Sequence, residues 1–136
     1  MWRDVDEEQR SNEPASSDCV FCKIVAGELP SRMVYEDDLV VAFHDVTPVA
    51  KVHVLVVPRE HFTQLDESTE ANEPLLGRVM RVASEIAKQM SINESGYRIA
   101  VNQGADAGQI VDHLHMHVLG GQNLYPLGET ITGTEG

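Results

Sequence analysis

Positive charge is scarce in this sequence. Its 136 residues include 10 lysines and arginines against 22 aspartates and glutamates, which gives a formal net charge of −12 at pH 7. Binding to a nucleic-acid backbone needs clustered basic side chains, so the composition argues against a nucleic-acid partner. It does not exclude a phosphorylated small molecule, because backbone N–H groups and histidines can bind phosphate locally.

Long hydrophobic runs are also absent. No apolar segment approaches the roughly 20 residues of a membrane-spanning helix, and the opening stretch MWRDVDEEQR does not resemble a secretory signal. We therefore expect a cytoplasmic protein with no membrane partner. The chain has two cysteines, Cys19 and Cys22. Their spacing suits a metal-binding or redox pair in a reducing compartment better than a disulfide framework.

Hydrophobic patterning begins after residue 18. Residues 1–18 are acidic and poor in apolar side chains, which predicts a disordered tail. We expect one folded domain over residues 19–136. Strand-like segments occur at residues 33–38, 39–45, 52–58, 97–102 and 112–121, and a helix runs from about Glu73 to Met90, capped by Asn72. This order indicates an α+β fold with a mainly antiparallel sheet and one long helix.

The segment DHLHMHVLGG places His113, His115 and His117 at every second position. On a strand these three imidazoles would share one face, with neighbours roughly 6–7 Å apart. One interpretation is a metal site, since neutral imidazole is a common ligand, although the outer pair would be roughly 13 Å apart. The other is nucleophilic and acid–base catalysis at phosphorus. The preceding loop, NQGADAGQ, favours catalysis because its glycines let backbone approach an anion.

Four segments together resemble the histidine-triad (HIT) family of nucleotide hydrolases and transferases, in particular its Hint branch: CVFCKIVAGELPSRMVYEDD, VAFHDVTPVAKVHVLVVPREH, GYRIAVNQGADAGQ and HLHMHVL. The resemblance covers about residues 18 to 121 in unbroken order. It implies a HIT-like α+β fold and a homodimer in which the sheets of two subunits join. It also implies a purine nucleotide substrate for each subunit.

The resemblance assigns catalytic roles to two histidines. His115 would attack the α-phosphorus of a nucleoside phosphoramidate or related nucleotidyl substrate, and water would hydrolyse the covalent nucleotidyl-histidine. His117 would contact the phosphate and the leaving group. The carbonyl of His113 would accept a hydrogen bond from the His115 ring, which fixes the tautomer that a nucleophilic imidazole needs.

The resemblance also implies a nucleotide site. Asp45 would hold the ribose hydroxyls, Gly108 and Gln109 would bring backbone close to the phosphate, and Asn102 would orient it. The positions that match the base pocket are Phe21, Ile24, Leu29, Phe43 and Leu55; core packing explains these five residues equally well.

Zinc is the cofactor that the resemblance implies. Two cysteines alone are too few for a structural zinc site, which needs four ligands. The matching positions in zinc-bearing relatives add His53 and His113 to Cys19 and Cys22.

The sequence departs from the Hint pattern near the triad. Ile110 occupies the position of a serine whose hydroxyl can donate to the scissile bridge, and Asp112 replaces an aromatic residue. The C-terminal segment also differs from the tail of animal relatives. The intact triad favours an enzyme, whereas the missing serine and the long acidic tail leave a second hypothesis open, a nucleotide-binding adaptor or sensor with vestigial catalysis.

Overall fold

The computed structural model describes residues 19–127. The predicted tail, residues 1–18, and the last part of the predicted domain, residues 128–136, lie outside the described residues. Five strands form one antiparallel sheet in the order β1-β2-β3-β5-β4. They are β1 (Met33–Glu36), β2 (Val40–His44), β3 (Val52–Pro58), β4 (Tyr97–Ala100) and β5 (Met116–Gly120).

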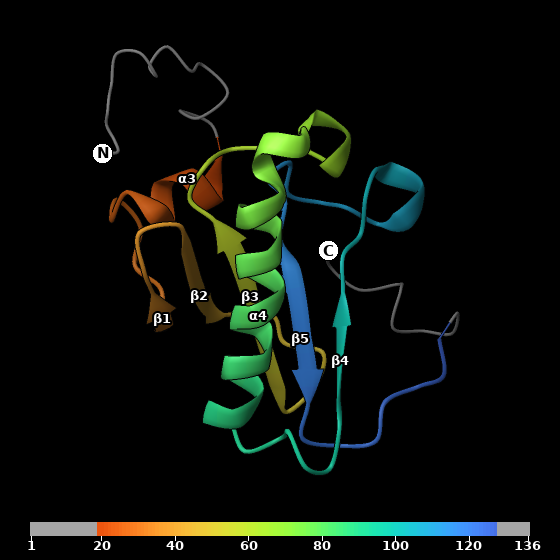
Figure 1. Cartoon of the computed structure of the whole chain (residues 1–136). Helices are drawn as coiled ribbons and strands as arrows, with labels where there is room; N and C mark the ends of the chain where they lie inside the picture. Colours follow the sequence, from red (N-terminus) through yellow and green to blue (C-terminus); the bar gives the residue numbers. More distant parts are fainter. Residues whose placement is uncertain (1–18, 128–136) are drawn as a thin grey trace.

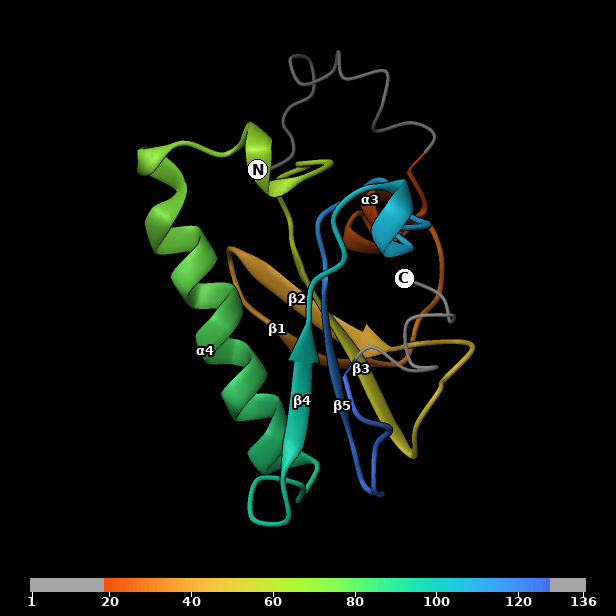
Figure 2. The same cartoon turned by 90° about the vertical axis from the view of Figure 1, so that its right-hand side faces the viewer.

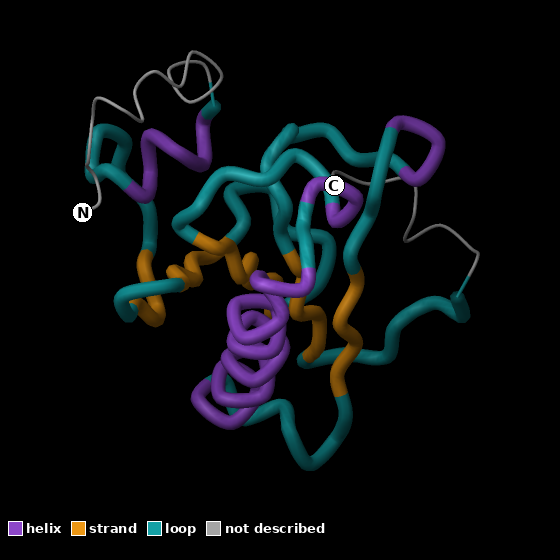
Figure 3. The backbone as a smooth tube through the Cα atoms, turned by 45° about the horizontal axis from the view of Figure 1, so that its top comes forward, coloured by secondary structure: helices purple, strands orange, loops and turns teal. Residues whose placement is uncertain are grey.

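Helices lie on both faces of the sheet. The long helix α4 (Glu73–Gln89) covers one face, and the short helix α3 (Val20–Val25) lies on the other (Figures 1 and 2). Figure 3 shows α4 nearly along its axis, in front of the strands. Three single-turn 3-10 helices, η1 (Leu65–Glu67), η2 (Glu70–Asn72) and η3 (Ala105–Ala107), lie in the connections. The predicted α+β fold with an antiparallel sheet and one long helix is confirmed.

Alternation along the strands explains why both faces are covered. In β2 and β3, side chains at even positions, such as Ala42 and Val56, pack in the cluster that includes Ile86 of α4. Side chains at odd positions, such as Phe43 and Leu55, pack with α3 instead. Successive residues of a strand point to opposite faces, so strands with apolar residues at both positions require a cover on each side.

The start of α4 differs from the prediction in its cap. Asn72 precedes the helix, but its side chain makes no capping hydrogen bond to α4. Its amide oxygen instead accepts from the backbone N–H of Thr69 at 2.8 Å and closes a capping box around η2. The η2 turn and α4 thus compete for the same Asn72 side chain, and η2 binds it. Pro74 lies in the first turn of α4, where its missing N–H costs no hydrogen bond within the helix.

The histidine strand is shorter than predicted. A strand over residues 112–121 was expected, whereas β5 begins at Met116. The backbone N–H of Leu114 donates to the carbonyl of Phe62 at 2.6 Å, in the loop that follows β3. Because the N-terminal part of the segment pairs with this loop rather than with a strand, His113 and His115 precede the regular ladder. No helix among residues 19–127 is long and apolar enough to cross a membrane.

Ile86 tests the packing of α4 on the sheet. Its side chain is fully buried, so Ile86→Ala should lower the free energy of unfolding by about 2–5 kcal/mol through lost burial and a residual cavity. Met80→Ala, at a position on the same helix that is 53% exposed, should change it by about 0.5 kcal/mol or less. Chemical denaturation measures both changes, and equal losses would contradict this packing.

Candidate functional site

A pocket of about 350 Å³ opens beside α3, the C-terminal end of β2 and the middle of β3. Six of the nine predicted nucleotide-binding residues line it: Phe21, Ile24, Leu29, Phe43, Asp45 and Leu55. His115 lies in its wall, and its ring meets the Phe21 ring edge-on at a centroid distance of 5.1 Å. The lining residues that the sequence analysis did not predict are Val20, Pro30, Ser31, His44, Val46, Thr47, Ile110 and Val111.

The tautomer of His115 is set by the main chain. Its Nδ1 lies 2.7 Å from the carbonyl oxygen of His113, and a carbonyl can only accept, so Nδ1 carries the proton. In the neutral ring Nε2 then has an unprotonated lone pair. The side chain is buried in the pocket wall, with 2% of the residue exposed. This is the tautomer that a nucleophilic imidazole requires.

A second hydrogen-bonded chain fixes His53 and His117. The backbone N–H of Val49 donates to Nδ1 of His53 at 3.1 Å, so the proton of neutral His53 is on Nε2. That Nε2–H donates to Nδ1 of His117 at 2.8 Å. The proton of His117 is therefore on its own Nε2, which is buried and has no hydrogen-bond partner among the described residues. His117 presents an N–H donor next to His115, at a ring-centroid distance of 5.1 Å.

Burial keeps His117 uncharged at neutral pH. Loss of solvent lowers its pKa from 6.5 to about 3, and the neighbouring rings of His115 and His53 act in the same direction. The carboxylate of Asp45 opposes the shift but does not outweigh it. At pH 7 the ring is therefore neutral and carries an N–H group that can donate to a ligand.

Asp45 has a different environment at each carboxylate oxygen. Oδ1 accepts from the backbone N–H of Thr47 at 2.8 Å and from the Thr47 hydroxyl at 3.2 Å, in a turn just after β2. Oδ2 lies 3.4 Å from Nε2 of His53. The side chain lines the pocket, so a ligand there can reach the carboxylate.

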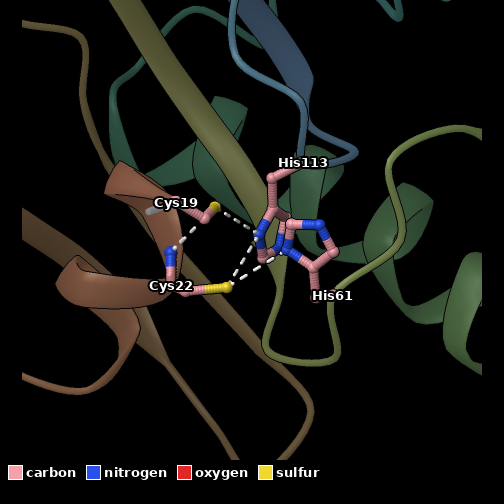
Figure 4. A group of neighbouring side chains, drawn as sticks. All are labelled: Cys19, Cys22, His61 and His113. Carbon is pink, nitrogen blue, oxygen red and sulfur yellow. Dashed lines mark hydrogen bonds between the residues drawn. The ribbon is translucent and has the colours of Figure 1, made fainter. Parts of the chain in front are cut away.

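Two cysteines and two histidines converge at the opposite end of the histidine row (Figure 4). Nδ1 of His113 lies 3.3 Å from Sγ of Cys19 and 3.5 Å from Sγ of Cys22, and Nδ1 of His61 lies 3.2 Å from Sγ of Cys22. Their four ligand atoms all lie within 4.8 Å of one another. Two sulfurs and two imidazole nitrogens form a donor set typical of structural zinc.

The protonation states in this cysteine–histidine group suit a cation. Nε2 of His113 donates to the carbonyl of Pro58 at 2.8 Å, so the lone pair of neutral His113 is on Nδ1, the nitrogen that faces the sulfurs. The hydrogen bond with Cys22 lowers the pKa of the Cys19 thiol, and His113 and His61 lower it further, against the opposing effect of burial. A thiolate is the form that binds a metal.

The structure corrects one member of the predicted ligand set. His53 does not lie with the cysteines, and His61 takes its place. His53 is opposite Leu119 at the start of β3, whereas His113 contacts Pro58 at the end of that strand. His61 is not among the predicted ligands, although it is the last residue of the segment VAFHDVTPVAKVHVLVVPREH. It lies just after β3, whose last residue, Pro58, contacts His113.

Asp45, His53 and His117 also bring three ligand atoms within 4.8 Å. The tautomer of His53 argues against a metal there. Nε2 of His53 carries the proton, and moving it to Nδ1 would set two donors against each other, because Val49 already donates to Nδ1. This group is better described as a hydrogen-bonded network.

Three predicted phosphate-site residues do not line the pocket. The backbone N–H groups of Gly108 and Gln109 donate within the loop, to Ala105 at 3.0 Å and Gly104 at 3.1 Å. The Gln109 side chain accepts from the Gly104 N–H and donates to the carbonyls of Thr63 and Val111. Gln109 thus stabilises the loop through side-chain hydrogen bonds, and Asn102, the first residue of the same loop, is half-buried.

The antiparallel sheet and the alternating histidines beside a pocket are features of histidine-triad proteins, and residues 26–124 match the family model of the HIT domain. The chain belongs to the HIT family. It is 42% identical over 112 residues to the purine nucleoside phosphoramidase of Escherichia coli (strain K12). That alignment spans 82% of this chain and 94% of the relative.

Solved structures agree with this assignment. A HIT family hydrolase from Clostridium thermocellum is 46% identical, with a TM-score of 0.78, and the match covers 80% of this chain and 95% of that one. A zinc-bound histidine triad family protein from Mycobacterium smegmatis is 31% identical, with a TM-score of 0.69 and coverage of 84% and 82%. At this level the chain is a hydrolase of the HIT family.

The depressed pKa of His117 makes a prediction about acid stability. The unfolded chain binds a proton at this residue below about pH 6.5, whereas the folded chain does so only near pH 3. The contribution of His117 to stability is therefore complete above pH 6.5 and is lost as the pH falls toward 3, with a slope approaching about 1.4 kcal/mol per pH unit.

Urea unfolding between pH 7 and pH 4 measures this slope. His117→Gln, which cannot titrate, should give a shallower dependence than the natural chain. An unchanged slope in this variant would assign the acid sensitivity to other groups, such as the cysteine–histidine group.

Proposed function

We propose that the protein cleaves the α-phosphate bond of a nucleoside phosphoramidate or related nucleotidyl substrate through a covalent nucleotidyl-His115 intermediate. The observation that carries this proposal is the pair of opposite tautomers beside one pocket: an unprotonated Nε2 on His115 and an N–H donor on His117. The name of the Escherichia coli relative supports the substrate class.

The two tautomers give the two histidines different roles in the first step, nucleophile for His115 and proton donor for His117. Nε2 of His115 attacks the α-phosphorus, and the bond from phosphorus to the leaving nitrogen breaks. The proton on Nε2 of His117 passes to that nitrogen, so the leaving group departs as a neutral amine, and His117 is left as an imidazolate whose Nδ1 still accepts from the N–H of His53. In the second step water attacks the phosphorus and restores His115, and its proton returns to His117.

The pocket suits a purine nucleoside. Its volume of about 350 Å³ lies at the lower end of the range for small-molecule sites, and its walls are aromatic and aliphatic. Phe21, Leu29 and Phe43 can pack against a flat base, while Oδ2 of Asp45 can accept from the ribose hydroxyls. These walls recognise shape more than hydrogen-bonding pattern, which suits a purine in general.

Zinc is the metal that we assign to Cys19, Cys22, His61 and His113. The donor set fits it, and a HIT relative has zinc bound. The ion would join α3, the loop after β3 and the start of the histidine segment. With all four coordination positions taken by protein atoms its role would be structural, so no catalytic step involves it.

A homodimer is the assembly that we propose. β4 is an edge strand of the sheet, and its Tyr97 and Ile99 are 38% and 36% exposed. An edge strand with exposed apolar side chains favours pairing with another strand. Two β4 edges that pair would join the sheets of two subunits into one.

His115→Ala should abolish turnover but change nucleotide affinity by no more than about tenfold, roughly 1.4 kcal/mol. The imidazole forms the covalent bond, whereas the base and ribose contacts supply most of the binding. Amine release from an adenosine phosphoramidate measures turnover, and titration with adenosine monophosphate measures affinity. Turnover near the natural rate in this variant would rule out the covalent mechanism.

Mass spectrometry after brief incubation with the same substrate tests the intermediate directly. A nucleotidyl adduct on His115 is expected in the natural chain. Bound but unmodified nucleotide, without amine release, would instead indicate a nucleotide-binding module.

His61 and His53 provide matched variants for the metal assignment. Elemental analysis of protein purified without chelator should find one zinc per subunit. His61→Ala should lose most of this zinc, because one of four ligands is gone, whereas His53→Ala should retain it. Zinc lost from His53→Ala but kept by His61→Ala would restore the ligand set inferred from the sequence, and a metal-free natural chain would contradict the zinc assignment.

Ile110 lines the pocket, is 66% exposed and offers no proton donor. General-acid help is worth roughly 10²–10⁴-fold, and poor leaving groups need it most. Ile110→Ser should therefore accelerate release of alkyl amines more than release of weakly basic aryl amines. Equal acceleration of both classes, measured as kcat/KM, would show that Ile110 affects packing rather than proton donation.

A further inference from the structure

One carboxylate oxygen connects the pocket with the histidine row. Oδ1 of Asp45 already accepts two hydrogen bonds from Thr47, which fixes the carboxylate in place. Oδ2 is the oxygen left for a ligand in the pocket, and it also lies 3.4 Å from Nε2 of His53. Any donor that reaches Oδ2 from the pocket therefore changes the negative charge that His53 faces.

The N–H group of His53 donates to one acceptor and lies close to a second, charged group that could compete for its proton. Nδ1 of His117 lies 2.8 Å away, and Oδ2 of Asp45 lies 3.4 Å away. The His53 side chain is 1% exposed, so water does not screen this competition. A carboxylate is the stronger acceptor, and its charge draws the proton away from the line to His117.

We propose that Asp45 and His53 couple ribose binding to proton donation by His117. This inference rests on the proposed function. Ribose hydroxyls that donate to Oδ2 disperse its charge, so the N–H of His53 donates fully to Nδ1 of His117. That hydrogen bond withdraws electron density from the His117 ring and makes its Nε2–H a stronger acid toward the leaving nitrogen. His53 is then a positioning residue, which acts only through His117.

The coupling predicts an effect of the ribose hydroxyls on the rate of the bound substrate, whereas a contribution of the hydroxyls to binding alone predicts an effect on affinity only. Substrates that lack both ribose hydroxyls should bind more weakly whatever their leaving group. Under the proposal they should also react more slowly once bound, but only where the leaving nitrogen needs a proton. In the substrate the ribose hydroxyls and the leaving nitrogen are connected only through the sugar, the 5′-oxygen and the α-phosphorus, so removing the hydroxyls leaves the bond that breaks chemically unchanged.

The experiment uses four substrates: adenosine and 2′,3′-dideoxyadenosine 5′-phosphoramidates, each with an alkyl amine or a weakly basic aryl amine. Single-turnover reactions at saturating protein give the rate constant for amine release, and the protein dependence gives half-saturation. Removing the hydroxyls should slow release of the alkyl amine about tenfold or more and that of the aryl amine less than about threefold, since part of a general-acid effect of 10²–10⁴-fold is lost.

Two variants of His53, tested with the same four substrates, show whether the effect of the hydroxyls depends on this residue. In His53→Phe, which cannot donate to His117, the hydroxyls should no longer affect the release rate constant, although they still affect half-saturation. His53→Gln places an amide N–H near the position of the ring Nε2–H and should restore the effect. An effect of the hydroxyls on half-saturation alone, an equal effect on both amines, or an effect that persists in His53→Phe would overturn the coupling.

Failure of the proposed function gives a different result, because then no substrate releases amine from the natural chain, and both proposals fall. A ligand-binding measurement covers the case in which His53→Phe does not fold. Adenosine monophosphate should shift the ¹⁵N resonance of His117 Nε2 in the natural chain, and its 2′,3′-dideoxy analogue should shift it much less. Equal shifts from the two nucleotides would overturn the coupling without any variant.

Discussion

Main-chain hydrogen bonds decide which nitrogen carries the proton in His53, His113 and His115, and His53 passes that choice on to His117. The chemistry of the site depends on these tautomers. The carbonyl of Pro58 accepts a hydrogen bond from Nε2 of His113, and the carbonyl of His113 accepts one from Nδ1 of His115, so these nitrogens carry the protons. The N–H of Val49 faces His53 and forces its proton to the other nitrogen. Because these backbone groups belong to the strands and their adjoining loops, the sheet itself sets the tautomers.

Burial makes this arrangement necessary. His53, His113, His115 and His117 are each at most 4% exposed, where an unpaired polar group or an unpaired charge is unfavourable. Neutral rings with defined partners avoid both penalties. The same burial limits the water that would compete with the proposed nucleophile, so the conditions that stabilise the folded core also suit the proposed phosphoryl chemistry.

Local pattern predicted the element order, and the family resemblance predicted much of the pocket wall and three of the four residues of the metal group, but neither predicted His61. Strand alternation depends only on neighbouring residues, so the side of the sheet that Phe43 and Leu55 occupy follows from the sequence. Which of His53 and His61 meets the cysteines depends on the register of β3 against β5. Register is a long-range property, and both histidines flank the same strand. The resemblance likewise located Gln109 but not the loop-bracing contacts of its side chain.

The two outer histidines of the row, His113 and His117, differ from His115 in the group that their Nδ1 atom faces. Nδ1 of His113 faces the sulfurs of Cys19 and Cys22, and Nδ1 of His117 accepts from His53. His113 therefore has a partner at both ring nitrogens, and Nδ1 of His117 is occupied by the N–H of His53. His115 takes its one main-chain hydrogen bond on Nδ1 and lies in the wall of the pocket, with its unprotonated nitrogen on the other side of the ring. The identical spacing of the three residues therefore conceals three distinct environments, and among the three rings only that of His115 lines the ligand pocket.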